Sequence, residues 1–294
     1  MYLPDFNYYQ PETIPEACEI LVRYGSKAKV LAGGTDVLPK MKQELLVPEA
    51  LVSLRAISGM SDIEYLPGRG VVIGARATPN DLVNSTILND KFMSVSEAAH
   101  TMANNQVRNM GSIGGNIVNA VPSADLPPIL IALGATVVLV GMEGGRTMPL
   151  EDFITGPSRT LIAPDEILEA VVIPDQLTTG SAYIKFGLRA SGALAVVGVA
   201  AAVTMVAGVA EEVRIVLGAV APIPLRSKKA ETKLRGKKIT DTLISEAAKI
   251  AASECKPISD IRASEEYRRE MVRVFTRSAL LKAMYLEETE RKFE

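Results

Sequence analysis

The stretch Gly111-Ser112-Ile113-Gly114-Gly115-Asn116-Ile117-Val118-Asn119-Ala120-Val121-Pro122-Ser123-Ala124-Asp125 decides how the rest of the chain is interpreted. Glycine has no Cβ, so the backbone at such positions can approach a bulky ligand closely. Successive backbone N–H groups in a glycine-rich turn form a concave nest that favours phosphate. The side chains of Asn116, Asn119 and Ser123 add hydrogen-bonding groups beside it. The stretch therefore predicts a phosphate-binding loop.

A second stretch of similar composition lies upstream, at Val30-Leu31-Ala32-Gly33-Gly34-Thr35-Asp36, directly after a short apolar run that predicts a strand. A Gly-Gly pair alone is usually only a turn. The chain contains neither G-x-G-x-x-G nor G-x-x-x-x-G-K-[ST], so the common Rossmann and P-loop interpretations are weak. Two glycine-rich loops can instead hold one pyrophosphate from both sides, and together they predict a dinucleotide site.

The composition is that of a globular protein with a sizeable core. The chain has 294 residues, of which 48% are hydrophobic, enough for one large domain or two ordinary ones. Lys plus Arg number 32 and Asp plus Glu number 34, which gives a formal net charge of -2. This balance offers no electrostatic argument for binding nucleic acid or an anionic membrane.

The cysteines and the single histidine predict no metal site and no catalytic residue. Cys18 and Cys255 lie far apart, without the spacing of a metal cluster or of a disulfide framework, and we expect both to be reduced thiols. His100 has no acidic or nucleophilic neighbour in the sequence, which favours a structural role. The first residues do not have the pattern of a signal peptide, so we expect a cytoplasmic protein.

One uncharged segment is long enough for a membrane span to be considered. Residues 193–210 carry no charge, but they are mostly Ala, Val and Gly. Gly208 breaks the segment before a polar turn at Glu211-Glu212, and Val213–Leu217 follows with a strand-like pattern. We therefore predict two buried strands joined by a tight turn and no membrane span.

The pattern along the chain predicts two domains of an α+β protein. Residues 1–177 form the first domain, with lobes at about 1–55 and 56–177, and a polar, glycine-ended segment marks its end. Residues 178–285 form the second domain, and residues 286–294 a tail. In the second domain three strand-like runs, at 182–188, 194–206 and 213–219, precede helical patterns near 241–255 and 264–286.

Three motifs resemble a known family. Ala32-Gly33-Gly34-Thr35-Asp36, Ser112-Ile113-Gly114-Gly115-Asn116 and Pro122-Ser123-Ala124-Asp125-Leu126 are similar to the two flavin-binding loops of the molybdenum hydroxylases. The narrower resemblance is to the medium, FAD-binding subunit of the xanthine dehydrogenase and carbon monoxide dehydrogenase group, and it covers about residues 6–283. It implies a two-lobed FAD-binding domain of the vanillyl-alcohol-oxidase-like (PCMH) type, followed by a smaller domain of a three-stranded antiparallel sheet packed with helices.

The resemblance also implies which residues hold FAD. The loop Val30 through Val37, which comes first along the chain, and the Ser112–Asn116 segment would hold the pyrophosphate with its ribityl and ribose groups. Asp125 would contact the adenosine half, and Leu168 and Lys185 would lie near the flavin edge, where the lysine would favour negative charge on the reduced ring. The complete set of predicted cofactor-binding residues is Val30, Leu31, Ala32, Gly33, Gly34, Thr35, Asp36, Val37, Met102, Ser112, Ile113, Gly114, Gly115, Asn116, Asn119, Ser123, Asp125, Leu168 and Lys185.

Two positions bear on the subgroup within the family. Met102 lies where animal xanthine dehydrogenases carry a phenylalanine. Leu194 lies where carbon monoxide dehydrogenase subunits carry a tyrosine over the flavin ring and xanthine dehydrogenases carry an aliphatic residue. On this resemblance Leu194 favours the xanthine dehydrogenase-like side.

The family implies a division of labour among subunits. A large subunit would react with substrate at a molybdenum cofactor, and a small subunit would carry two [2Fe–2S] clusters. This chain would exchange electrons with an external carrier through FAD, in a dimer of heterotrimers. The substrate and the carrier (NAD, a quinone, ferredoxin or oxygen) stay open. Two alternatives remain, namely a stand-alone FAD oxidoreductase of the same fold and a non-enzymatic nucleotide-binding module.

Overall fold

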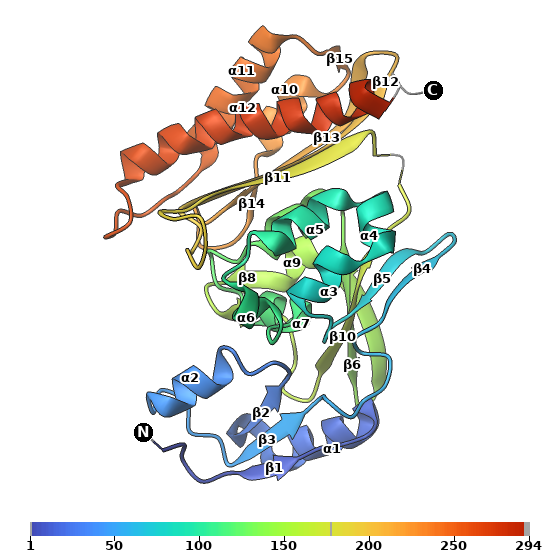
Figure 1. The fold of residues 1–294 in the computed structure, drawn as a ribbon, viewed down its shortest axis with the longest axis vertical. Helices are drawn as coiled ribbons and strands as arrows, with labels where there is room; N and C mark the ends of the chain where they lie inside the picture. Colours follow the sequence, from blue (N-terminus) through green and yellow to red (C-terminus); the bar gives the residue numbers. More distant parts are fainter. Residues whose placement is uncertain (1, 177, 291–294) are drawn as a thin grey trace.

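The computed structural model describes residues 2–176 and 178–290, and it has three parts stacked along its long axis (Figure 1). An N-terminal lobe lies at one end, a central lobe in the middle and a C-terminal domain at the other end. The predicted division at residue 177 lies outside the described residues, so that boundary stays a prediction. The mixed α and β architecture agrees with the predicted fold class.

The N-terminal lobe is a small parallel sheet with the order β1-β3-β2. Its elements are β1 (Asn7–Tyr9), α1 (Ile14–Tyr24), the short 3₁₀ helix η1 (Gly25–Lys27), β2 (Ala28–Leu31), α2 (Val37–Lys42) and β3 (Ala50–Ser53). Thr13 caps α1, because its Oγ1 accepts a hydrogen bond from the N–H of Glu16 at 3.3 Å. The first glycine-rich loop, residues 32–36, therefore connects the carboxyl end of β2 to α2.

The central lobe is built on an antiparallel sheet with the order β4-β5-β10-β6-β7. Helices cover it, and a small hairpin lies beside it. The strands are β4 (Ile63–Leu66), β5 (Gly70–Gly74), β6 (Thr136–Gly141), β7 (Gly144–Pro149), β8 (Ile154–Gly156), β9 (Arg159–Thr160) and β10 (Ile167–Ile173). The helices are α3 (Pro79–Asn84), α4 (Thr86–Lys91), α5 (Met93–His100), α6 (Asn105–Arg108), α7 (Ile113–Val118), α8 (Leu126–Ala132) and α9 (Leu150–Phe153).

The C-terminal domain has three long antiparallel strands, as predicted, together with two strands of two residues each that the sequence did not reveal. The strands are β11 (Gly180–Phe186), β12 (Val197–Val206), β13 (Val209–Gly218), β14 (Leu225–Arg226) and β15 (Lys237–Lys238). The helices are α10 (Lys228–Leu234), α11 (Asp241–Glu254) and α12 (Glu265–Glu290). Helix α12 includes residues 286–290 of the predicted tail, and residues 291–294 lie outside the described part.

The uncharged segment at 193–210 forms strands, as the sequence predicts. It supplies β12 and the start of β13, which are joined at Ala207 and Gly208, both with positive φ. Most of β12 is buried between α8 of the central lobe and α12. Within the described residues, no helix combines the length and the apolar character that a bilayer crossing requires.

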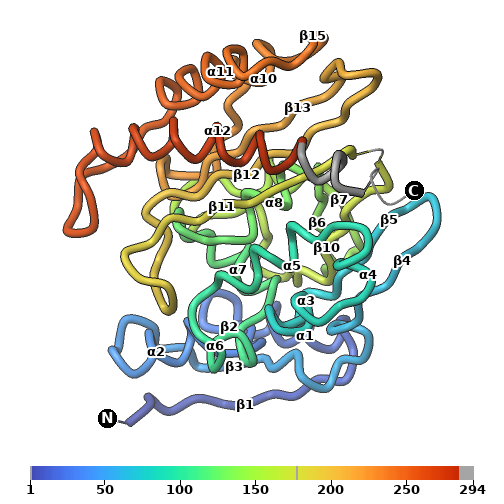
Figure 2. Tube along the Cα trace, turned by 45° about the horizontal axis from the view of Figure 1, so that its top comes forward, coloured from blue at the N-terminus to red at the C-terminus, as the bar shows by residue number. Residues whose placement is uncertain are grey.

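The C-terminal domain is joined to the central lobe by polar contacts as well as by packing. Nη1 of Arg226 lies 3.0 Å from Oε2 of Glu151, and Nζ of Lys282 lies 2.6 Å from Oε2 of Glu97. Figure 2 shows α12 running across β11 and β12, on the side away from α5 and α8. The C-terminal sheet is thus enclosed between its own helices and those of the central lobe.

Candidate functional site

A single cleft of about 970 Å³ runs between the three parts of the molecule. The N-terminal lobe contributes β2 and the first glycine-rich loop. The central lobe contributes the segment from Met102 through α7, the residues between α7 and α8, and the residues at the start of β10 and before it. The C-terminal domain contributes Gly192, Ala193 and Leu194, from the loop between β11 and β12. The two loops predicted to bind pyrophosphate therefore line one space.

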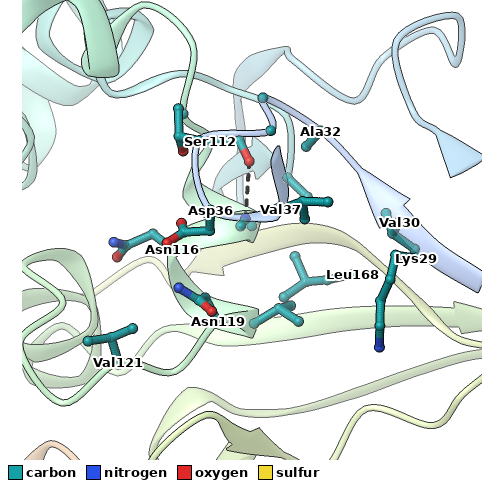
Figure 3. A pocket seen from close by; sticks show the side chains of 18 of the residues that line it. Lys29, Val30, Ala32, Asp36, Val37, Ser112, Asn116, Asn119, Val121 and Leu168 are labelled. Carbon is teal, nitrogen blue, oxygen red and sulfur yellow. Dashed lines mark hydrogen bonds between the residues drawn. The ribbon is translucent and has the colours of Figure 1, made fainter. Parts of the chain in front are cut away.

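Sixteen of the predicted cofactor-binding residues line this cleft. They are Val30, Ala32, Gly33, Gly34, Thr35, Asp36, Val37, Met102, Ser112, Gly114, Gly115, Asn116, Asn119, Ser123, Asp125 and Leu168. Leu31, Ile113 and Lys185 are not among the lining residues, and Ile113 is completely buried. Figure 3 shows Asp36 of the first loop, and Asn116 and Asn119 of the second, reaching into the same part of the cleft.

The first loop offers free backbone donors. Among the described residues, the N–H groups of the five residues Gly33–Val37 have no protein acceptor. Gly34 has a φ of 74°, a left-handed conformation that glycine adopts without strain and that turns the loop toward α2. A run of unpaired N–H groups beside a cleft fits an anion such as a diphosphate.

The second glycine-rich loop along the chain, residues 111–125, uses its backbone donors differently from the sequence prediction. Ser112 caps α7, and its Oγ accepts the N–H of Gly115 at 3.1 Å. The N–H of Ile113 donates to Ala77 O at 2.9 Å and that of Gly114 to Ala75 O at 2.9 Å. These donors are occupied within the protein. What this loop presents to the cleft is therefore mainly its side chains.

Two of the predicted glycines are required by packing inside the protein. A Cβ on Gly33 would overlap the backbone carbonyl of Met110, so the two loops touch each other at this point. A Cβ on Gly114 would lie 2.7 Å from both Cβ and O of Ala75. Packing against Met110 and Ala75 is therefore a second reason for glycine at these positions, in addition to the close approach to a ligand expected from the sequence.

Asn116 carries a polar atom without a partner in the described structure. Its Oδ1 is buried and makes no hydrogen bond to the described protein. Buried polar side-chain atoms are nearly always hydrogen-bonded in native proteins, and leaving one unpaired costs free energy. Asn116 lines the cleft. The unpaired oxygen therefore points to a ligand with a hydrogen-bond donor.

A buried ion pair joins the C-terminal domain to this site. Nζ of Lys185 on β11 lies 2.8 Å from Oδ2 of Asp125, and the two side chains are 8% and 9% exposed. Lys185 also donates to Thr101 O at 3.0 Å, and the hydroxyl of Tyr183 donates to Oδ1 of Asp125 at 3.0 Å. Burial raises the pKa of Asp125, while Lys185 and Tyr183 act in the opposite direction. Burial, followed by the nearby Asp125, raises the pKa of Tyr183.

This pairing changes the expected roles of both residues. The resemblance assigned Asp125 to the adenosine half of FAD and Lys185 to the flavin edge. In the structure the two side chains are in direct contact, at 2.8 Å. Asp125 and Thr101 hold the ammonium group of Lys185 beside the wall of the cleft. Its charge is therefore balanced by Asp125 within the protein.

Several cleft residues were not found from the sequence. Lys29, Lys40 and Arg108 bring positive charge to the lining, and Glu166 brings negative charge. Nζ of Lys40 donates to Oδ1 of Asn119 at 3.0 Å and so connects α2 to the end of α7. Lys40 is separated from the nearer motif by a proline, and no local pattern marks it. Among the described residues, no group of three or more His, Cys, Asp and Glu is arranged to hold a metal ion.

These features fit FAD. The cleft volume is at the upper end of the range of roughly 300–1,000 Å³ in which ligand sites fall. The first loop supplies unpaired N–H donors for phosphate oxygens, and Asn116 supplies an unpaired acceptor for a hydroxyl or N–H of the ligand. The donor set suits a long, polar dinucleotide with an anionic centre.

Family models match almost the whole chain. Residues 4–176 match the FAD binding domain in molybdopterin dehydrogenase, and residues 182–283 match the CO dehydrogenase flavoprotein C-terminal domain. The carbon monoxide dehydrogenase medium chain of Hydrogenophaga pseudoflava is 36% identical over 281 residues, which are 95% of this chain and 97% of the relative. The xanthine dehydrogenase FAD-binding subunit of Escherichia coli O157:H7 is 28% identical, over 95% of this chain and 96% of the relative.

A solved structure has the same fold. Carbon monoxide dehydrogenase from Hydrogenophaga pseudoflava lacking the Mo-pyranopterin moiety of the molybdenum cofactor superimposes with a TM-score of 0.92 at 36% identity, over 96% of this chain and 98% of that one. The higher identity to this enzyme than to the xanthine dehydrogenase subunit runs against the subgroup that Leu194 favoured. The chain belongs to the FAD-binding medium subunits of the molybdenum hydroxylases, the family that includes those of carbon monoxide dehydrogenase and xanthine dehydrogenase.

Proposed function

We propose that the chain binds one FAD in the cleft between its three parts and uses it to pass electrons. The observation that carries this proposal is the meeting of the two glycine-rich loops. The N–H groups of Gly33–Val37 and the side chain of Asn116 face one cleft without protein partners among the described residues. When bound, FAD supplies hydride and single-electron transfer at its isoalloxazine ring, while the protein binds and orients it.

The roles of the residues follow from their positions. The backbone of Gly33–Val37 donates hydrogen bonds to the diphosphate, and Asn116 and Asn119 bind the polar groups attached to it. Met102 and Leu194 line the end of the cleft next to the C-terminal domain, where apolar side chains suit the flat face of a ring. Gly33, Gly114 and Ser112 hold the two loops in shape. The ion pair of Asp125 and Lys185 keeps the C-terminal domain against this end of the cleft.

The proposal includes partner subunits. A large subunit with a molybdenum cofactor reacts with the substrate, and a small subunit with [2Fe–2S] clusters carries electrons to or from this chain. The three form a heterotrimer that associates as a dimer, located in the cytoplasm. The support is that the relatives are themselves named medium chains and FAD-binding subunits. Both cysteines are free and buried, which suits a reducing compartment.

Copurification of the full chain tests this assignment. We expect a tagged chain to bring down two further subunits, with molybdenum, iron and FAD in the complex and a flavin absorbance near ~450 nm. A chain that purifies alone, binds FAD and turns over a substrate would support the stand-alone oxidoreductase instead. A folded chain that binds a nucleotide but no flavin would support a nucleotide-binding module.

A further inference from the structure

Lys40 reaches from one glycine-rich loop to the other. It lies on α2, one turn after the first loop, and its backbone N–H donates to Asp36 O at 3.2 Å. Its Nζ donates to Oδ1 of Asn119, at the end of α7, over 3.0 Å. These two residues are 79 positions apart in the sequence, and both line the cleft. An ammonium group is therefore placed where the N-terminal and central lobes meet.

The charged groups near the two loops indicate what this ammonium group can bind. The first loop carries the carboxylate of Asp36, which is exposed and would repel a diphosphate in the same loop. Arg108 is engaged away from the loops, with its guanidinium donating to Met102 O and to Asn80. Lys29 lies apart from Asp36, Asn116 and Asn119 (Figure 3). Among the described cleft residues, Lys40 is thus the cation in direct contact with one of the two loops.

We propose that Lys40 is the counter-ion of the FAD diphosphate and that Asn119 positions it. This inference rests on the proposed function. A lysine ammonium has three N–H donors. Asn119 accepts one of them in the structure, and the other two have no acceptor among the described residues, so they are available to phosphate oxygens. Lysine binds phosphate as a point charge on a flexible stem, so it can hold Asn119 and the diphosphate together. The backbone donors of Gly33–Val37 then supply hydrogen bonds, and Lys40 supplies the charge.

Titration with FAD and with riboflavin tests this role. Riboflavin carries the flavin ring and ribityl chain of FAD without any phosphate. The full chain, with the subunits that copurify with it, is stripped of flavin and titrated with each compound. We expect Lys40→Met to weaken FAD about tenfold, or about 1.4 kcal/mol, and to leave riboflavin affinity within about twofold. Lys40→Arg retains the charge and should restore most of the FAD affinity.

Lys42→Met is the matched control. Lys42 is an exposed lysine on the same helix and does not line the cleft, so its replacement should leave both affinities unchanged. Unchanged riboflavin binding by Lys40→Met shows that the cleft is intact. Equal FAD affinity in wild type and Lys40→Met would overturn the role of Lys40 and leave the proposed function standing. An equal loss for FAD and riboflavin would also overturn it. A wild-type protein that binds neither compound would overturn the proposed function as well.

Discussion

The ammonium nitrogen of Lys185 lies 2.8 Å from Oδ2 of Asp125, and this contact joins β11 of the C-terminal domain to the start of α8 in the central lobe. Both side chains are almost fully buried, and Tyr183 and Thr101 complete the set of hydrogen bonds. A buried pair of this kind holds two domains in one arrangement, because separating them leaves a charge without a partner in a dry site.

The first prediction concerns the loss of one partner of this pair. Lys185→Met leaves the Asp125 carboxylate buried alone, and Asp125→Asn leaves the ammonium alone. Each should lower the free energy of unfolding by about 3 kcal/mol, measured by urea denaturation. The double variant should lower the free energy of unfolding by less than the sum of the two single losses, because it leaves neither charge unpaired.

Lys27→Met is the control. Lys27 and its partner Glu49 are both more than half exposed, so we expect a loss below ~1 kcal/mol. Strict additivity of the two single losses would contradict a direct interaction.

The second prediction concerns pH. Burial raises the folded-state pKa of Asp125 above its unfolded value. A raised carboxyl pKa contributes stability that is complete below the unfolded value and is lost as pH rises through the folded value. Without the opposing charge of Lys185, this pKa should rise further. The unfolding free energy of Lys185→Met should therefore fall more steeply with rising pH than that of wild type, from acid conditions toward neutrality. Identical slopes for the two proteins would contradict the pairing.

The third prediction separates packing glycines from open ones. Gly33→Ala places a Cβ on the carbonyl of Met110, so the backbone of the two loops must move apart. We expect this to lower the unfolding free energy by about 2 kcal/mol. Gly115→Ala meets only Oγ of Ser112, at 3.0 Å, within a helix where alanine is favoured. Its stability should stay within about 1 kcal/mol of wild type, by the same denaturation measurement. A Gly33→Ala protein as stable as Gly115→Ala would show that the loops do not touch as described.

Arg226 forms ion pairs with carboxylates of both the C-terminal domain and the central lobe, and the fourth prediction is its replacement. It pairs with Glu231 at 2.7 Å and with Glu151 of the central lobe at 3.0 Å. Burial raises the pKa of Glu151, but the hydrogen bond and the charge of Arg226, together with Lys228, lower it below its usual value. Arg226→Met leaves the buried carboxylate of Glu231 without its ion-pair partner and with only the N–H of Ile215 as a donor. A loss of about 3 kcal/mol is expected in thermal or urea unfolding.

Lys228 provides the comparison for Arg226. It also faces Glu151, at 3.4 Å, but its side chain is 72% exposed. Exposed ion pairs contribute little, so Lys228→Met should change stability by less than about 1 kcal/mol. If both variants lost the same amount, burial of Glu231 would not explain the effect of Arg226.

The sequence predicted those features that depend on local composition. The sequence revealed the two glycine-rich loops and the strands β12 and β13. Glycine pairs, turn residues and apolar runs are patterns of a few consecutive residues, so they can be recognised without the fold. The glycine-rich composition of both loops predicted one shared dinucleotide site, and sixteen of the nineteen residues that the sequence and the family resemblance named line the cleft.

What the sequence did not reveal depends on contacts between distant residues. The carbonyls of Ala75 and Ala77, more than thirty positions upstream, accept N–H groups of the second loop and so determine which of its donors stay free. The role of Gly33 depends on Met110, and the ion pair of Lys185 joins two domains. Lys40 and Asn119 meet only after folding, which explains why Lys40 was missed. Leu194 favoured the xanthine dehydrogenase-like side, whereas the carbon monoxide dehydrogenase medium chain of Hydrogenophaga pseudoflava is more identical to this chain than the Escherichia coli O157:H7 xanthine dehydrogenase subunit is. One position carries little information about relatedness.

Hydrogen exchange of the first loop, with and without FAD, tests the central claim most directly. The amide hydrogens of Gly33–Val37 have no protein acceptor in the described structure, so they should exchange fast in the flavin-free chain. FAD should slow the exchange of these amides by at least about tenfold, because the diphosphate then accepts their hydrogen bonds. Exchange that stays fast in these amides while FAD is bound, as shown by its absorbance, would contradict the account.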